Sequence, residues 1–205
     1  MKKRHSNSCI YVAVLYKLHF CFAKLLNTHK TFCYTQRARM TARSLVTTKL
    51  GPVVGEQIIS SGCSKPVHRF LGIPYAKAPV GQFRFRRPVP LDTPWSEPLQ
   101  ATQWPPQCPQ FSATPFNKAC EPYFKNSTQS EDCLKLNIWS PDVSGVFSAA
   151  EEGSLKRPVL VWIHGGGLVA GTASFDLYDG ELFASEHDLV FVSFNYRLVI
   201  LFVCT

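Results

Sequence analysis

Residues 159–171, VLVWIHGGGLVAG, join an uncharged apolar run to a histidine and three consecutive glycines. Because glycine is costly to order and has no side chain to pack, three in a row indicate that bare backbone is needed there. A chain that leaves a buried strand at His164 and turns through Gly165, Gly166 and Gly167 can direct successive N–H groups into a cavity. Such fixed donors suit negative charge developing on a carbonyl oxygen, and each is worth about 3–4 kcal/mol of barrier. The segment therefore predicts an oxyanion-stabilising turn, with a plain tight turn as the alternative.

Other chemistries find little support in the motifs. The phosphate-cradling patterns GxxxxGK[ST] and GxGxxG are absent, so the glycines do not predict a nucleotide site. Neither CxxC nor HExxH occurs among the eight cysteines and six histidines, which argues against a metal site or a redox dithiol. We expect no cofactor and no metal.

The elements that must position the glycines read as an α/β fold. Short β-rich runs at 45–58 and 67–76 flank a turn-like SSGCSKP and predict N-terminal strands. Residues 134–139, LKLNIW, alternate like a half-buried strand. Continuous apolar runs predict parallel strands covered on both faces, and they are RPVLVWIH (157–164) and DLVFVSFNYR (188–197). We expect an antiparallel N-terminal edge leading into a mostly parallel sheet.

Two connecting segments complete this pattern. Residues 78–122 are dense in proline, which removes backbone donors, and predict ordered loop wrapped around the core. Residues 175–187, FDLYDGELFASEH, have helical or loop character.

The net charge of +8 belongs to one end of the chain. Residues 1–45 carry nine Lys or Arg and no acid, whereas residues 46–205 carry thirteen bases against fourteen acids. The globular part is therefore close to neutral, and we expect no nucleic-acid partner.

The basic segment 1–44 admits several interpretations. Lys2, Lys3 and Arg4 before an apolar stretch resemble a secretory signal, but Lys17 and Lys24 interrupt that stretch and no small-residue cleavage site follows. An acid-free leader also fits a mitochondrial presequence. The apolar run is far shorter than the roughly 20 residues of a membrane span, so we expect none. We favour an N-terminal extension ahead of a domain that starts near Leu45, with Met40 as an alternative start.

Four stretches in chain order resemble the type-B carboxylesterases and cholinesterase-like proteins of the α/β-hydrolase fold. They are FLGIPYAKAPVGQFRF (70–85), SEDCLKLNIWSP (130–141), WIHGGG (162–167) and NYRL (195–198). A strand followed by HGGG is a known feature of lipases and esterases. The likeness runs from about Leu45 to Leu198 and covers only the first part of such a family domain. It predicts an extension at 1–44, a partial carboxylesterase domain at 45–198 and a divergent tail at 199–205.

The resemblance assigns roles to the glycine segment. It implies that Gly166 and Gly167 supply oxyanion-hole N–H donors and that Gly165 gives the bend. His164 stands where the family often has a structural histidine or tyrosine, so it is not the catalytic base. The remaining histidines of the domain, His68 and His187, are expected to be ordinary surface or strand-end residues.

The resemblance also pairs Cys108 with Cys133, closing the proline-rich loop over the site entrance. Cys120 inside this loop departs from the pattern and is either free or a competitor for pairing. Asn126 begins a glycosylation sequon, NST, in the same loop. Together these features favour an oxidising compartment and the secretory pathway, with a cytoplasmic location as the alternative if Met40 is the start.

The family reaction needs a serine on a GxSxG elbow, a histidine base and an orienting acid. No GxSxG occurs in the 205 residues; the nearest match, GCSKP (62–66), lacks the second glycine. We therefore expect the chain to be inactive alone, as a truncated form of a serine ester hydrolase that acts on small-molecule esters. A non-catalytic cholinesterase-like adhesion or binding domain is the alternative.

Two further expectations come from the resemblance and the end of the sequence. Family members continue NYRL with a glycine, whereas VILFVCT follows here. Because valine codons begin with the usual first bases of an intron, we expect Val199 to mark read-through past an exon end, against the alternative of a genuine short variant. The last strand, apolar on both faces, is expected to expose an unpaired edge that promotes aggregation.

Overall fold

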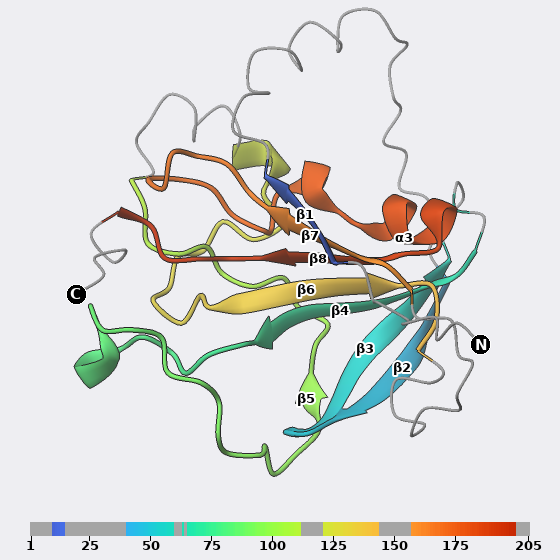
Figure 1. Cartoon of the computed structure of the whole chain (residues 1–205), viewed down its shortest axis with the longest axis horizontal. Coiled ribbons are helices and arrows are strands. Elements are labelled where there is room, and N and C mark those ends of the chain that lie inside the picture. Colours follow the sequence, from blue (N-terminus) through green and yellow to red (C-terminus); the bar gives the residue numbers. More distant parts are fainter. Residues whose placement is uncertain are drawn as a thin grey trace, which may run out of the picture.

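The computed structural model describes residues 10–14, 40–59, 63, 65–111, 121–143 and 157–199. The strands are β1 (Ile10–Val14), β2 (Met40–Thr48), β3 (Gly51–Ile59), β4 (Val67–Pro74), β5 (Leu99–Gln100), β6 (Lys135–Ser140), β7 (Val159–Ile163) and β8 (Val190–Phe194). The helices are the 3-10 turns η1 (Gly81–Phe83), η2 (Glu121–Tyr123) and η3 (Asp176–Tyr178) and the α-helix α3 (Glu181–His187). Within these residues the strands form one eight-stranded sheet in the order β1-β7-β8-β6-β4-β3-β2, with β5 paired to β3 (Figure 1).

The N-terminal strands form the antiparallel side of the sheet. β2 and β3 make a hairpin in which Thr48 pairs with Gly51, and β4 pairs antiparallel with both β3 and β6. The Thr48 hydroxyl donates to the Gly51 carbonyl at 2.8 Å and closes the turn. The expected N-terminal strands are present, although β2 begins at Met40, so the boundary predicted at Leu45 falls inside this strand.

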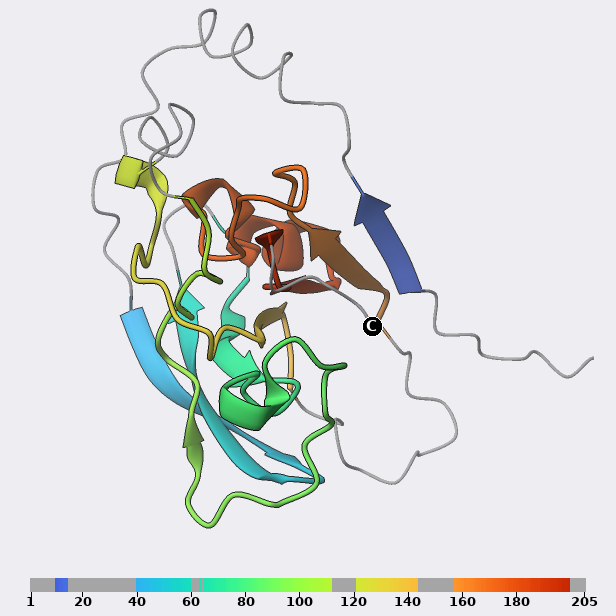
Figure 2. The ribbon, with the colours of Figure 1, turned by 90° about the vertical axis from the view of Figure 1, so that its left-hand side faces the viewer.

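The other side of the sheet is parallel, as the continuous apolar runs predict. β8 pairs parallel with β7, and β7 pairs parallel with β1, so that β1 and β2 lie at opposite edges (Figure 2). The expectation that β8 exposes an unpaired edge is wrong. β8 is an inner strand of the sheet: it pairs with β7 on one side and with β6 on the other.

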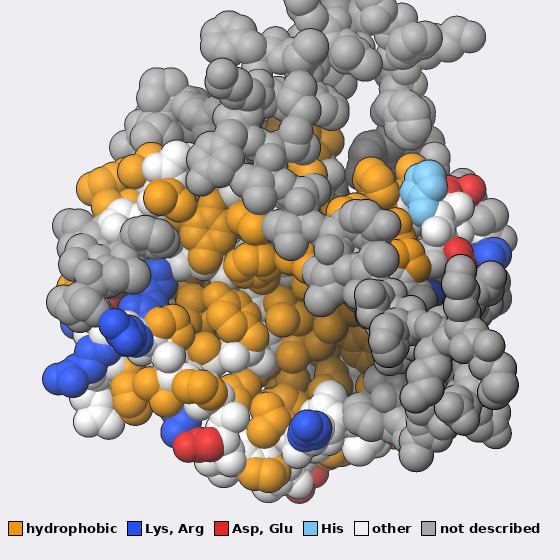
Figure 3. Space-filling view, viewed as in Figure 1, with side chains coloured by type: hydrophobic (Ala, Val, Ile, Leu, Met, Phe, Trp, Pro, Cys, Tyr) orange, Lys and Arg blue, Asp and Glu red, His pale blue; other side chains and the backbone are white. Residues whose placement is uncertain are grey.

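The main core lies between the sheet and α3, which packs against β4, β6 and β8. Trp139 of β6, Phe191 of β8 and Ala184 of α3 are almost completely buried together. All five residues of β7 remain partly exposed within the described structure. The reason is that α3 packs mainly on β4, β6 and β8, so it gives β7 little cover. Hydrophobic side chains gather across the centre of the face in Figure 3.

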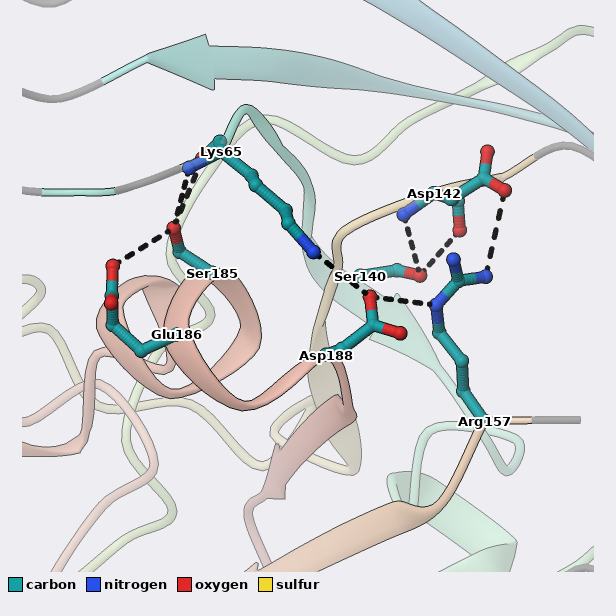
Figure 4. Close-up of polar contacts among 7 residues, drawn as sticks. All are labelled: Lys65, Ser140, Asp142, Arg157, Ser185, Glu186 and Asp188. Atoms are coloured by element: carbon teal, nitrogen blue, oxygen red, sulfur yellow. Dashed lines mark hydrogen bonds and ion pairs between the residues drawn. The ribbon is translucent and has the colours of Figure 1, made fainter.

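Charged groups connect the loops at the end of the sheet where β7 and β8 begin (Figure 4). Arg157 contacts Asp188 at 3.3 Å and Asp142 at 3.5 Å. Lys65 contacts Asp188 at 3.8 Å, and its backbone N–H donates to the Ser185 hydroxyl at 3.0 Å. These pairs are partly exposed and long, so each contributes little, at most about 1 kcal/mol. They lie at the opposite end of β7 from the three glycines.

Candidate active site

Residues 164–171, here called the glycine turn, follow the carboxyl end of β7. The backbone enters the left-handed region at Gly166 (φ +127°), Gly167 (φ +64°) and Leu168 (φ +63°). Gly165 has no positive φ, so the reversal falls on the next two glycines and not on Gly165 as expected. The N–H groups of Val169 and Ala170 both donate to the Gly166 carbonyl at 3.1 Å and close the turn.

Glycine is required in this turn for steric reasons. A Cβ on Gly166 would overlap the carbonyl group of Ala170. A Cβ on Gly171 (φ +120°) would lie 2.5 Å from both the Gly165 carbonyl oxygen and the His164 Nδ1 atom. Gly167 has room for a side chain, since the nearest atom is 3.9 Å away, and it needs glycine for its φ alone. The two ends of the turn therefore lie in direct contact, which only glycine at 171 allows.

The N–H groups of the three glycines form no hydrogen bond within the described part of the chain. Gly165 and Gly166 are half-buried and Gly167 is exposed. Beside them, the apolar side chains of Leu168 and Val169 are 39% and 52% exposed. The turn thus presents free backbone donors next to apolar surface.

The side chain of His164 is buried and contacts the backbone of the turn. Its ring is 3% exposed and stacks on Tyr196 at a centroid distance of 4.2 Å. Nδ1 lies 3.0 Å from the Gly165 carbonyl, which can only accept, so the proton is on Nδ1. Burial lowers the pKa of His164 to about 4, partly offset by this hydrogen bond. His164 is therefore neutral near pH 7 and is held as a structural group.

Asn195 and Tyr196 belong to the NYRL stretch, which directly follows β8, and they hold the turn through hydrogen bonds. The Tyr196 hydroxyl donates to the His164 carbonyl at 2.5 Å. Asn195 is 1% exposed; its Oδ1 accepts the Ala173 N–H at 2.7 Å and its Nδ2 donates to the Pro106 carbonyl at 2.8 Å. The sequence flagged this stretch only through the family resemblance and assigned neither side chain a role.

The described part of the loop closed by the Cys108–Cys133 disulfide, here called the disulfide loop (residues 108–133), contacts the end of the turn. Cys108 and Cys133 form the expected disulfide, with a Cα–Cα distance of 5.1 Å. Both cysteines are 1% exposed and pack against Leu134 and Leu198. Gln110, two residues after Cys108, hydrogen-bonds the backbone of Gly171. No sequence signal marked Gln110, because its partner is distant along the chain.

The other histidines lie away from the turn. His68 pairs with Ser140 across the sheet, at the end opposite to the turn, and its Nδ1 lies 2.8 Å from the Ser44 hydroxyl oxygen. Burial lowers its pKa, with a partial offset from Asp142. His187 ends α3 on the same side. Neither side chain is placed to act at the glycine turn.

The remaining predicted groups have ordinary surroundings. Asn126 is half-buried; its Nδ2 donates to the Trp104 carbonyl at 2.9 Å, and its Oδ1 accepts the Thr128 hydroxyl at 2.6 Å. The Cys63 thiol is free and donates to a Glu181 carboxylate oxygen at 3.6 Å. The other cysteines lie outside the described residues, and they are Cys9, Cys21, Cys33, Cys120 and Cys204.

The described residues contain neither a metal-binding cluster nor a helix that could span a membrane. No group of three or more His, Cys, Asp or Glu there is arranged to hold a metal ion. No helix in the described ranges has the length and apolar character needed to cross a membrane.

A mixed sheet whose inner strand ends in a glycine turn of this kind defines a partial α/β-hydrolase domain. The profile of the carboxylesterase family matches residues 42–205. The chain belongs to the carboxylesterase family, as the four sequence stretches predict.

Individual relatives agree with this assignment. The chain is 42% identical over 139 residues to an acetylcholinesterase of Leptinotarsa decemlineata, covering 65% of this chain and 22% of that protein. It is 40% identical over 154 residues to the para-nitrobenzyl esterase of Bacillus subtilis, covering 75% of this chain and 27% of that protein. The solved structure of a PNB esterase superposes with a TM-score of 0.60 at 39% identity, covering 77% of this chain and 28% of that one. The chain thus spans about a quarter of the length of these relatives.

Proposed function

We propose that the glycine turn is the oxyanion-stabilising part of a serine carboxylesterase site. The observation that carries this proposal is the pair of left-handed glycines, Gly166 and Gly167, whose N–H groups are unpaired in the described structure at the carboxyl end of a parallel strand. In such a reaction a serine oxygen attacks the ester carbonyl, and the C=O electron pair moves to oxygen. Donors fixed in advance stabilise that oxyanion without reorganising. The alcohol then leaves, and water hydrolyses the acyl-enzyme.

The described histidines do not supply the base of this proposed site. The sequence contains no GxSxG, and His164 is buried, neutral and bonded to its own turn. The reaction also needs a serine nucleophile and a histidine base. The 205 residues therefore contribute anion stabilisation and part of the substrate surface.

The surface beside the donors supports an uncharged ester as substrate. Leu168 and Val169 offer exposed apolar contact, and the segment between Cys108 and Cys133 contains phenylalanine and tyrosine but no tryptophan. Tryptophan is the best cation–π partner for a quaternary ammonium group. We infer a preference for neutral esters over choline esters.

A chimera tests both proposals. Residues 45–198 replace the matching segment of the Bacillus subtilis para-nitrobenzyl esterase, and kcat and KM are measured on a neutral thioester and on acetylthiocholine. We expect turnover of the neutral substrate with the higher kcat/KM. Gly166→Ala keeps the N–H group, but its Cβ overlaps the Ala170 carbonyl and displaces the donor. We expect kcat to fall by roughly 10²–10³-fold, as when one oxyanion donor is lost.

The control is Gly81→Ala, which also has a positive φ (+54°) but has no atom within 4 Å of its added Cβ. This variant is expected to keep the parent kcat. A folded chimera without turnover contradicts the esterase proposal and favours a binding domain, and full activity in Gly166→Ala contradicts the role of the turn. Higher kcat/KM on acetylthiocholine contradicts the substrate proposal.

The disulfide loop also supports a proposal about location. A buried disulfide persists in oxidising compartments, and Asn126 begins a sequon in the same loop. We infer entry into the secretory pathway with a glycan on the Asn126 Nδ2 atom. Mass spectrometry of the Asn126 peptide from secreted protein tests this; an unmodified peptide alongside glycosylated host proteins contradicts it.

A further inference from the structure

Gln110 makes a two-point contact with the glycine turn across 61 residues of sequence. Its Oε1 accepts the Gly171 N–H at 2.8 Å, and its Nε2 donates to the Gly171 carbonyl at 2.9 Å. A primary amide has the donor and the acceptor that this arrangement needs in one plane. The side chain therefore binds the Gly171 backbone as a neighbouring strand would.

Gly171, which Gln110 binds, packs against the residues that precede the Gly166 and Gly167 N–H groups. Gly171 lies directly against the Gly165 carbonyl and the His164 ring, with no space for even a Cβ between them. A displacement of Gly171 therefore moves the residues immediately before Gly166. The opposite face of the turn is held by Tyr196, which bonds the His164 carbonyl.

Gln110 is itself held on several sides. Its Nε2 also lies 3.1 Å from the Gln107 Oε1 and 3.3 Å from the Cys108 carbonyl, and its backbone N–H donates to the Gln129 Oε1 at 3.0 Å. Cys108 is fixed by the disulfide to Cys133, directly before β6. A covalent anchor on the sheet thus lies two residues from the amide that holds the turn.

We propose that Gln110 is a positioning residue that couples the disulfide loop to the glycine turn and sets the direction of the Gly166 and Gly167 N–H groups. It touches no reacting atom and acts through Gly171. The significance for catalysis rests on the function proposed above, whereas the coupling is a property of this chain and is tested without activity.

The test is amide hydrogen exchange, followed by NMR, in the 205-residue chain. The reporters are the N–H groups of Val169 and Ala170, which close the turn on Gly166, and of Gly171. In Gln110→Ala we expect exchange at all three to rise on the order of tenfold, the effect of losing about one hydrogen bond. The amide shifts of Gly166 and Gly167 are expected to move as well.

The matched control is Gln100→Ala, whose exposed side chain donates, among the described residues, to the nearby Pro98 carbonyl alone. It is expected to leave the three reporters unchanged. The coupling is overturned if Gln110→Ala exchanges like the parent, and equally if Gly171 alone changes while Val169 and Ala170 keep their protection.

Gln110→Glu separates positioning from general stability and serves as the second variant if Gln110→Ala does not fold. A protonated glutamate keeps both a donor and an acceptor, whereas a carboxylate lacks the donor and repels the Gly171 carbonyl. We therefore expect near-parental protection at low pH that is lost as pH rises through the glutamate pKa. Protection that follows the parent at every pH overturns the proposal.

The catalytic consequence is measured in the chimera described above. Gln110→Ala there is expected to lower kcat with KM nearly unchanged, because misdirected donors weaken transition-state binding alone. An inactive parental chimera counts against the proposed function and leaves the exchange results to decide the coupling. An active chimera whose kcat is unaffected by Gln110→Ala overturns the proposed link to the oxyanion donors.

Discussion

At the scale of single residues, Gly166 and Gly167 are adjacent and both left-handed, yet they need glycine for different reasons. A methyl group at 166 meets the Ala170 carbonyl, and one at 167 meets open space. We expect Gly167→Ala to cost about 1–2 kcal/mol, the usual penalty of a left-handed non-glycine residue. Gly166→Ala is expected to cost clearly more, because overlap with backbone cannot be relieved by a rotamer. Urea unfolding of both variants measures the difference; equal losses contradict the steric argument.

His164 makes the stability of the chain depend on pH. Its pKa falls from 6.5 to about 4 on folding, so between these values the unfolded chain binds a proton that the folded chain does not. The stabilisation is complete above pH 6.5 and is lost as pH falls towards 4, by about 3 kcal/mol in total. The pKa of His68 is also lowered by burial, so this residue too makes the folded chain less stable as pH falls. We expect His164→Phe to be less stable at pH 7 and to lose less stability between pH 6.5 and 4. Parallel pH profiles from urea unfolding contradict this.

Val199 is a β-branched residue in the left-handed region, with φ +56°. Its N–H donates to the Leu168 carbonyl at 2.8 Å, so the conformation is fixed by a bond to the glycine turn. The family resemblance places glycine at this position. We expect Val199→Gly to raise stability by about 1 kcal/mol, since the relief of strain exceeds the lost packing of a half-buried side chain.

The control for this change is Val190→Gly in β8, where the backbone is extended. That variant is expected to lower the urea midpoint, because glycine weakens a strand. A lower midpoint for Val199→Gly as well contradicts the assignment of strain to Val199.

At the scale of elements, the disulfide joins the loop after β5 to the start of β6, with a sequence separation of 25. The chain-entropy model gives roughly 3–4 kcal/mol for a loop of this length. We expect the double variant Cys108→Ser, Cys133→Ser to lose this much stability and to expose Gly171 to faster hydrogen exchange. Unfolding with and without reductant makes the same comparison in the parent chain, and an unchanged urea midpoint contradicts the prediction.

The charged contacts at the opposite end of the sheet differ from the disulfide in kind. Arg157 meets two aspartates at 3.3 Å and 3.5 Å, and its side chain is about one-third exposed. Solvent screening leaves such pairs little net energy. The elements around the glycine turn are therefore held by backbone-directed hydrogen bonds and the disulfide, while the ion pairs at the far end add little.

At the scale of the whole molecule, donors without a nucleophile cannot turn over an ester. The sequence contains no GxSxG, and the described histidines are either bonded within the turn or lie at the far end of the sheet. We therefore expect the folded 205-residue chain to hydrolyse p-nitrophenyl acetate no faster than buffer. The assay uses protein whose fold is checked by circular dichroism. A burst of nitrophenol equal to the protein concentration contradicts the prediction, because it requires a nucleophile within these residues.

The sequence by itself determined the central strands and their types, but not β1 or β5, which lie in segments predicted as an extension and a loop. Alternation predicts the half-buried strand at 134–139, and uninterrupted apolar runs predict the parallel pair β7 and β8, because each periodicity is a local property of the chain. The HGGG pattern also favours a backbone turn with free donors over a plain tight turn, since three consecutive glycines indicate that bare backbone is needed there. The disulfide between Cys108 and Cys133 came from family resemblance and not from spacing.

Only the tertiary structure decided what surrounds the turn. The hydrogen bonds between Gln110 and Gly171 join residues 61 positions apart in the sequence. The hydrogen bond from Asn195 to the Pro106 carbonyl joins residues 89 positions apart. Neither residue carries a periodic or compositional signal, because an amide that pairs with distant backbone looks like any polar loop residue. The inner place of β8 and the lowered pKa of His164 have the same origin. Both depend on which segments pack together, and packing between distant segments is a property of the folded chain as a whole.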